Sequence, residues 1–101
     1  MAIDYKVRLV TATPYTITND DEVILSNVTG ASSIVLPSLS SGNTGRSYYV
    51  KDFSGNSKLN PITITAPGGK TIDGAQFAIL NTPYSRVLLT YDGTNWKSIA
   101  G

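Results

Sequence analysis

Short runs in which apolar and polar residues alternate make up most of this chain. In residues 5–11, Tyr5, Val7 and Leu9 alternate with the cations Lys6 and Arg8, the period of two expected of a half-buried β-strand. No window free of Gly or Pro repeats apolar residues at helical spacing, so we predict no helix longer than one turn. Further strands are predicted over Tyr15–Thr18, Glu22–Ser26, Ser32–Leu36, Arg46–Phe53, Asn60–Thr65, Lys70–Asp73, Phe77–Leu80, Tyr84–Tyr91 and Trp96–Ala100.

Strand signals recur about every 8–12 residues, which favours a β-sandwich or barrel. We therefore predict an all-β fold, an antiparallel β-sandwich of jelly-roll type with at least seven strands. The 101 residues suffice for one domain, residues 1–101. Residues 1–13 form either an N-terminal strand or an attachment segment. Asp92–Asn95 is predicted to turn a hairpin that leaves Trp96 packed in the core.

Three predicted strands are apolar on both faces, which one small sandwich does not readily cover. One interpretation is that a few of these side chains stay partly exposed, as is common on protein surfaces. The interpretation we prefer is a subunit interface around a symmetry axis. The candidate interface residues are Val23, Ile24, Leu25, Ile34, Val35, Leu36, Val87, Leu88 and Leu89.

Composition narrows the possible functions. The chain has neither Cys nor His, which excludes disulfides and removes the two most versatile catalytic side chains. Its formal net charge is +1 and its cations are scattered, so nothing points to nucleic acid or to a membrane surface as a partner. Its apolar runs are too short for a membrane-spanning helix. Serine and threonine are plentiful, but no histidine is present to activate them.

Acidic residues and one glycine-rich segment are the remaining candidates for chemistry. Residues 20–22 could offer oxygen ligands to calcium, but the spacing matches no calcium loop, and a solvated turn is the simpler interpretation. Asp73 and Asp92 precede glycines, where Asp normally bonds to nearby backbone. Residues 68–71 resemble the end of a phosphate loop but lack its first glycine and its helix. We predict no catalytic residue, no metal site and no cofactor.

Aromatic residues could form a platform on which a sugar stacks. The candidate glycan contacts are Tyr48, Tyr49, Tyr84 and Tyr91. At strand positions such side chains more often pack in the core or against a cross-strand neighbour. Both interpretations stay open at this point.

Several phrases of the chain, taken in order, resemble a β-module of tailed-bacteriophage virion proteins. The similarity covers about residues 14–99 and includes the upstream segments 16–25 and 33–37. The phrases that carry it are Tyr49-Val50-Lys51-Asp52, Gly55-Asn56, Asn60-Pro61-Ile62-Thr63-Ile64, Gly69-x-Thr71-Ile72-Asp73-Gly74 and Tyr91-Asp92-Gly93-x-Asn95-Trp96.

That module occurs in head fibres, in capsid decorations and near the ends of tail fibres. The resemblance implies a non-enzymatic, homotrimeric structural protein on the capsid or tail surface of the virion. It implies as partners further copies of the chain and the major capsid protein or another virion protein. The alternative is the receptor- or glycan-binding tip of a tail fibre, which would add a host surface glycan. The module usually follows a coiled coil, a collagen-like stretch or an anchoring segment, whereas only Met1–Thr13 precede it here.

Overall fold

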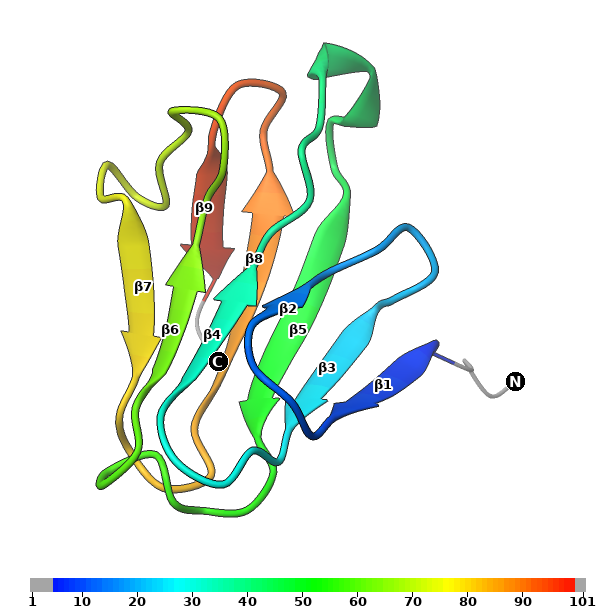
Figure 1. Cartoon of the computed structure of the whole chain (residues 1–101). Coiled ribbons are helices and arrows are strands. Elements are labelled where there is room, and N and C mark those ends of the chain that lie inside the picture. The colour runs from blue at the N-terminus through cyan, green and yellow to red at the C-terminus, as the bar shows by residue number, and fades with distance from the viewer. Residues whose placement is uncertain (1–4, 100–101) are drawn as a thin grey trace.

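Two β-sheets face each other in the computed structural model, which describes residues 5–99 (Figure 1). The five-stranded sheet has the order β1-β3-β5-β8-β9 and the four-stranded sheet the order β2-β4-β6-β7. The first sheet contains β1 (Val7–Val10), β3 (Val23–Ser26), β5 (Ser47–Asp52), β8 (Arg86–Tyr91) and β9 (Trp96–Ile99). The second contains β2 (Tyr15–Thr16), β4 (Ser32–Val35), β6 (Ile62–Thr65) and β7 (Phe77–Leu80).

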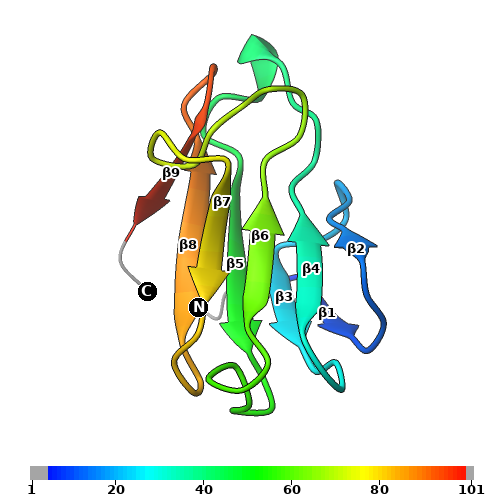
Figure 2. The same cartoon turned by 60° about the vertical axis from the view of Figure 1, so that its left-hand side comes forward.

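The first six strands pass from one sheet to the other at every step (Figure 2). Neighbours within a sheet are therefore two strands apart in sequence, and β1, β3 and β5 run parallel, as do β2, β4 and β6. The remaining pairs, β5–β8, β6–β7 and β8–β9, are antiparallel. The strands of the last two pairs are consecutive in the chain, whereas β6 and β7 of the other sheet separate β5 from β8. The predicted all-β fold is confirmed, and its two facing sheets are consistent with the predicted sandwich, but both sheets are mixed, so the purely antiparallel, jelly-roll arrangement is wrong. Alternation along a strand indicates its buried face and leaves the direction of its neighbour undefined.

Inward-facing side chains of both sheets form one core around Trp96, which is 1% exposed. The rings of Tyr48 and Tyr91 pack against Trp96, with centroids 6.0 and 5.2 Å from it. The predicted hairpin is confirmed, since β8 and β9 pair around residues 92–95 and Gly93 has a φ of 101°. Aromatic pairs at these separations add to the stabilisation that burial provides.

Most predicted strands lie where the sequence places them, with ends that differ by a few residues. The predicted strand over Lys70–Asp73 is reduced to isolated bridges from Ile72 to Ala75 and to Trp96. Within residues 5–99 the one helical element is a 3-10 turn, Ser41–Asn43, in a long loop. No helix in that part of the chain has the length and apolar character needed to cross a membrane.

Candidate functional site

The outer face of the five-stranded sheet carries an apolar row that crosses every strand. Pairing places Val7 beside Val23, Val23 beside Tyr49, Tyr49 beside Leu88, and Leu88 beside Ile99. Laterally paired residues point to the same side of a sheet. The neighbours of these residues along the strands, among them Ile24, Tyr48 and Leu89, fill the core. The row therefore lies on the outside. We call Val7, Val23, Tyr49, Leu88 and Ile99 the apolar row.

Strand β1 turns its apolar side outward. Its alternation correctly predicts a strand, but Val7 is 59% exposed and Leu9 is 49% exposed. Arg8 lies laterally beside the buried Ile24, but its side chain stays 49% exposed at the sheet edge. The apolar side of this strand faces solvent because the segment lies at the sheet edge, where Arg8 has a carboxylate partner. An edge strand that presents Val and Leu to solvent leaves a surface suited to a further protein contact.

The outer face of the four-stranded sheet is different in kind. The outward positions of β4 and β6 are Ser33, Val35, Thr63 and Thr65, and all four are only partly buried. Hydroxyl side chains thus dominate the centre of this face, and the large apolar side chains Phe77 and Ile79 are confined to its edge strand β7. The two faces of the sandwich are chemically unequal, and the apolar row marks the one that gains more from being covered.

The structure divides the nine candidate interface residues into three groups. Ile24, Ile34, Leu36 and Leu89 are fully buried in the core, because each alternates with an outward neighbour, so they offer no surface to a partner. Val87 is half-buried and packs on the core. The outward residues are Val23, Leu25 and Leu88 on the five-stranded sheet and Val35 on the opposite sheet.

The four candidate glycan tyrosines are divided as well. Tyr48 and Tyr91 are buried against Trp96, so neither can stack on a ligand. Tyr84 is 58% exposed in the β7–β8 loop, with the Lys51 Nζ 5.7 Å from its ring centroid. Tyr49 lies outward in the apolar row, and the exposed Tyr5 packs edge-to-face on it, with ring centroids 6.4 Å apart. The sequence did not single out Tyr5, although its alternation with Lys6 and Arg8 was visible there.

A groove of about 560 Å³ opens beside Tyr49 and Tyr5. Residues 42–47, which lead from the 3-10 turn into β5, form one wall, and Glu22 and Leu88 contribute elsewhere. Arg46 was not considered as a site residue, and Glu22 was considered only as a calcium ligand of the turn 20–22. They come from segments 24 residues apart, and the parallel pairing of β3 with β5 that brings them together was not expected.

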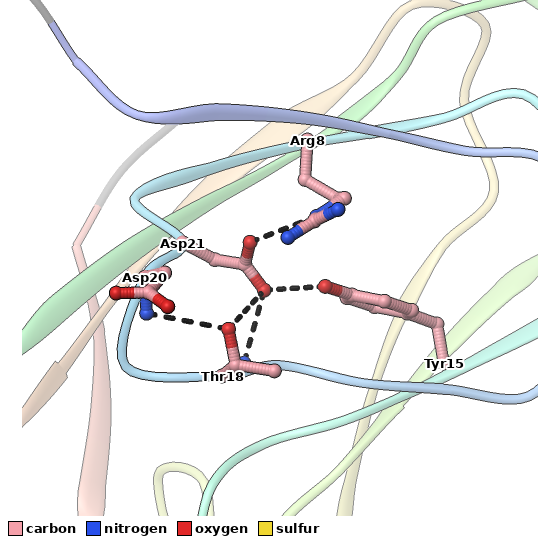
Figure 3. A network of polar contacts seen from close by, with 5 residues as sticks. All are labelled: Arg8, Tyr15, Thr18, Asp20 and Asp21. Atoms are coloured by element: carbon pink, nitrogen blue, oxygen red, sulfur yellow. Dashed lines mark hydrogen bonds and ion pairs between the residues drawn. The ribbon is translucent and has the colours of Figure 1, made fainter.

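Asp21 links the two sheets at the β1–β2 end of the sandwich (Figure 3). Its carboxylate accepts from Arg8 Nε on β1 at 3.1 Å and from the Tyr15 hydroxyl on β2 at 2.5 Å. The Thr18 N–H and hydroxyl donate to the same carboxylate at 2.9 and 3.2 Å. Burial alone raises the pKa of Asp21, but these donors outweigh it and hold the pKa below the ordinary value.

Asp52 is a second buried carboxylate that holds separate segments of the chain together, in its case two loops. Its buried carboxylate accepts from the N–H groups of Gly55, Ser57 and Tyr84 at 3.0 to 3.1 Å, which ties the β5–β6 and β7–β8 loops together. Burial raises the pKa of Asp52, and the hydrogen bonds from Ser57, Tyr84 and Gly55 lower it by more. The net effect favours the ionised form.

The other predicted acidic candidates also bond to their own chain. Asp73 accepts from the hydroxyl and N–H of Ser98, which lower its pKa. Asp92 accepts from the N–H groups of Asn95 and Thr94 within the hairpin, with the same effect on its pKa. Within residues 5–99 no group of three or more acidic side chains could hold a metal ion. Residues 20–22 therefore form a structural turn in which Asp21 is the anchor.

Comparison with known protein families found no match to this chain, and comparison with curated proteins found none either.

Proposed function

We propose that this chain is a non-enzymatic structural protein of a tailed-bacteriophage virion, a small homotrimeric capsid decoration or head fibre. The phrases that resemble the phage β-module supply the biological setting. The observation that carries the proposal is the apolar row, which crosses all five strands on an outer face. Solvent-exposed apolar surface of this continuity is characteristic of protein–protein contacts.

The occupant of this face is a further copy of the same chain. In a threefold arrangement, the two sides of each contact are different parts of the same protein surface. A sheet that faces the axis would contact one neighbour through its β1–β3 side and the other through its β8–β9 side. The row meets this requirement, since Val7 and Val23 lie on one side and Leu88 and Ile99 on the other.

The wider composition agrees with an architectural role. The carboxylates of Asp21, Asp52, Asp73 and Asp92 each hold loops or strands of the sandwich in place. We propose neither a disulfide nor a bound metal for this chain. A core of this size therefore gains stability when an outer face of the sandwich is also buried. Attachment to the particle would use the surfaces that the trimer leaves uncovered, against the major capsid protein or another virion protein.

Sedimentation equilibrium on the full chain tests the oligomer. We expect a mass near three times 10.7 kDa and a melting temperature that rises with protein concentration, as mass action requires. A 10.7 kDa species whose melting temperature does not change with concentration would refute the trimer. Cryo-electron microscopy of phage particles that carry the chain then tests the virion location separately.

A further inference from the structure

The end of the sandwich that carries the β5–β6 and β7–β8 loops is basic (Figure 1). The connections at this end are residues 11–14, 27–31, 53–61 and 81–85. Lys58 is the only charged residue in them. The adjoining strand ends add Lys51, Arg86 and Asp52, and the Asp52 carboxylate is buried against N–H groups of its own chain. Among the described residues, every charge that reaches solvent at this end is therefore positive.

The opposite end of the sandwich is acidic. Its loops are residues 17–22, 36–46, 66–76 and 92–95, and they hold five carboxylates against two cations. Along the sequence the cations of the basic end are scattered. The fold gathers Lys51 and Arg86 because β8 runs antiparallel to β5 and starts beside its end. Charges of one sign at one end attract a partner of the opposite sign.

Large apolar side chains project from the same basic end. Leu59 is 84% exposed, and Phe53 and Tyr84 are exposed as well. None of the loops at the acidic end exposes a large apolar side chain. We call the set of exposed apolar and cationic residues the basic tip. Its members are Lys51, Phe53, Lys58, Leu59, Tyr84 and Arg86.

The proposed subunit contact leaves the basic tip free. Lys51 and Arg86 pair with each other two positions beyond Tyr49 and Leu88 of the apolar row, at the margin of the same outer face. Burying two cations against a neighbouring subunit is costly, so the contact ends before them. The other members of the tip lie further out, in the loops.

Contacts between the two loops hold the basic tip in shape. Asp52 accepts N–H groups from both loops, and the Ser57 hydroxyl donates to the Thr82 carbonyl at 2.6 Å. The Tyr84 ring lies against Gly55, where a Cβ atom would come within 2.4 Å of the ring. Loops that are already ordered lower the entropic cost of binding.

We infer that the basic tip binds an anionic lipid bilayer. Its cations would lie at the level of the negatively charged head groups, which attract Lys and Arg near the membrane surface. Its apolar side chains would enter the boundary between head groups and acyl chains, where burial of apolar area adds to the electrostatic attraction. Tyr84 suits this boundary, since tyrosine pairs an apolar ring with a polar hydroxyl.

The projecting side chains favour a bilayer over the other occupants of such a surface. A protein partner would need a fitted pocket for each side chain, because protein interfaces are closely packed, whereas lipids rearrange around them. A second copy of the chain would offer its acidic end, whose loops expose no large apolar side chain in return. The inference uses only residues of the basic end, so it does not rest on the virion assignment.

Co-sedimentation of the full chain with lipid vesicles tests the inference. We expect binding to an equimolar mixture of phosphatidylserine and phosphatidylcholine that is about tenfold tighter than to phosphatidylcholine alone and that weakens as salt is raised. Lys58→Glu and Leu59→Ser should each weaken binding about tenfold. Lys70→Glu and Ile79→Ser are the matched controls, because Lys70 lies in a loop of the acidic end and the exposed Ile79 lies on β7.

A polarity-sensitive dye supplies the second readout, since the chain has no cysteine of its own. Attached through Asn56→Cys, in a loop of the basic end, the dye should shift its emission to the blue when mixed vesicles are added. Attached through Thr94→Cys, in the hairpin of the acidic end, it should not shift. Both positions are exposed, so the folded chain carries the dye.

No binding to the mixed vesicles, equal loss of binding in Lys70→Glu, or equal dye shifts at the two ends would each overturn the inference. Poly-glutamate carries negative charge without a bilayer and so represents an acidic protein partner. Binding to poly-glutamate but not to vesicles would assign the basic tip to such a partner and overturn the bilayer. Lost binding in a variant that melts with the parent supports the site, whereas lost binding only in variants that melt earlier overturns it.

Discussion

Leu88 and Val35 point away from the core in opposite directions, Leu88 from the five-stranded sheet and Val35 from the four-stranded sheet. Leu88 precedes the fully buried Leu89, and Val35 follows the fully buried Ile34. Leu88 lies among apolar neighbours of the row, whereas Val35 lies beside Thr16 and Thr65. An aspartate at position 88 therefore tests whether the outer face of the five-stranded sheet is the subunit interface, and an aspartate at position 35 is the matched control.

Leu88→Asp should give a monomer or an aggregate, because an unpaired carboxylate in an apolar contact costs several kcal/mol. Val35→Asp should leave the mass unchanged, since its face is hydroxyl-rich and stays in water. Sedimentation of both variants at equal concentration is the measurement. Dissociation by Val35→Asp alone would place the interface on the other sheet.

A pair of cysteines can report the threefold arrangement directly, since the chain has none of its own. Val7 and Ile99 lie at opposite edges of the same sheet, separated by four strand spacings, or about 19 Å. A disulfide needs Cα atoms within about 7 Å, so the two positions cannot bond within one chain. Val7→Cys combined with Ile99→Cys should give a covalent trimer on oxidation.

Each single cysteine variant is the control for that experiment. Neither should form the covalent trimer, because one thiol per chain can link two chains at most. Non-reducing electrophoresis reads the result. A disulfide-linked dimer from Val7→Cys alone would indicate a twofold contact through β1 in place of the threefold one.

Trp96→Ala should destabilise the domain by about 3–5 kcal/mol, the range for removing a large buried aromatic side chain. Trp96 contacts both Tyr48 and Tyr91, so the cavity would lie at the centre of the aromatic cluster. Urea unfolding followed by circular dichroism measures the loss. Lys97→Ala, an exposed neighbour on the same strand, should change stability little. A loss below about 1 kcal/mol for Trp96→Ala would contradict its packing role.

The sequence was sufficient to predict most of the strands, the hairpin and the burial of Trp96, because local alternation and turn residues encode them. It was not sufficient for β1, where the same alternation fits either face and a distant partner, Asp21, pairs with Arg8 at the sheet edge. It also missed the groove. Glu22 and Arg46 line one groove because β3 and β5 are parallel neighbours, a non-local feature that alternation does not specify.

Asp21→Ala should cost about 1–3 kcal/mol, because it leaves the Tyr15 hydroxyl and the Thr18 N–H without their buried acceptor. The exposed neighbour Asp20 makes a matched control, since Asp20→Ala removes the same charge and no contact to β1 or β2. Thermal unfolding of the two variants separates the contacts from the charge. Equal losses would show that the link between the sheets contributes nothing.

Acid should weaken the fold through Asp21 and Asp52. Both carboxyls have a pKa below the ordinary value of 3.8 in the folded chain. A depressed pKa means that the folded state binds protons less readily than the unfolded chain. The contribution of each carboxylate to the free energy of unfolding is therefore complete above pH 3.8 and is lost as the pH falls through the pKa of the folded state. We expect the unfolding free energy to decline below about pH 4.

Asp21→Asn should be less stable at neutral pH, and its stability should fall less steeply with acid. Urea titrations from pH 7 down to about pH 2 measure both slopes. Parallel curves for the two proteins would show that Asp21 does not couple proton binding to folding.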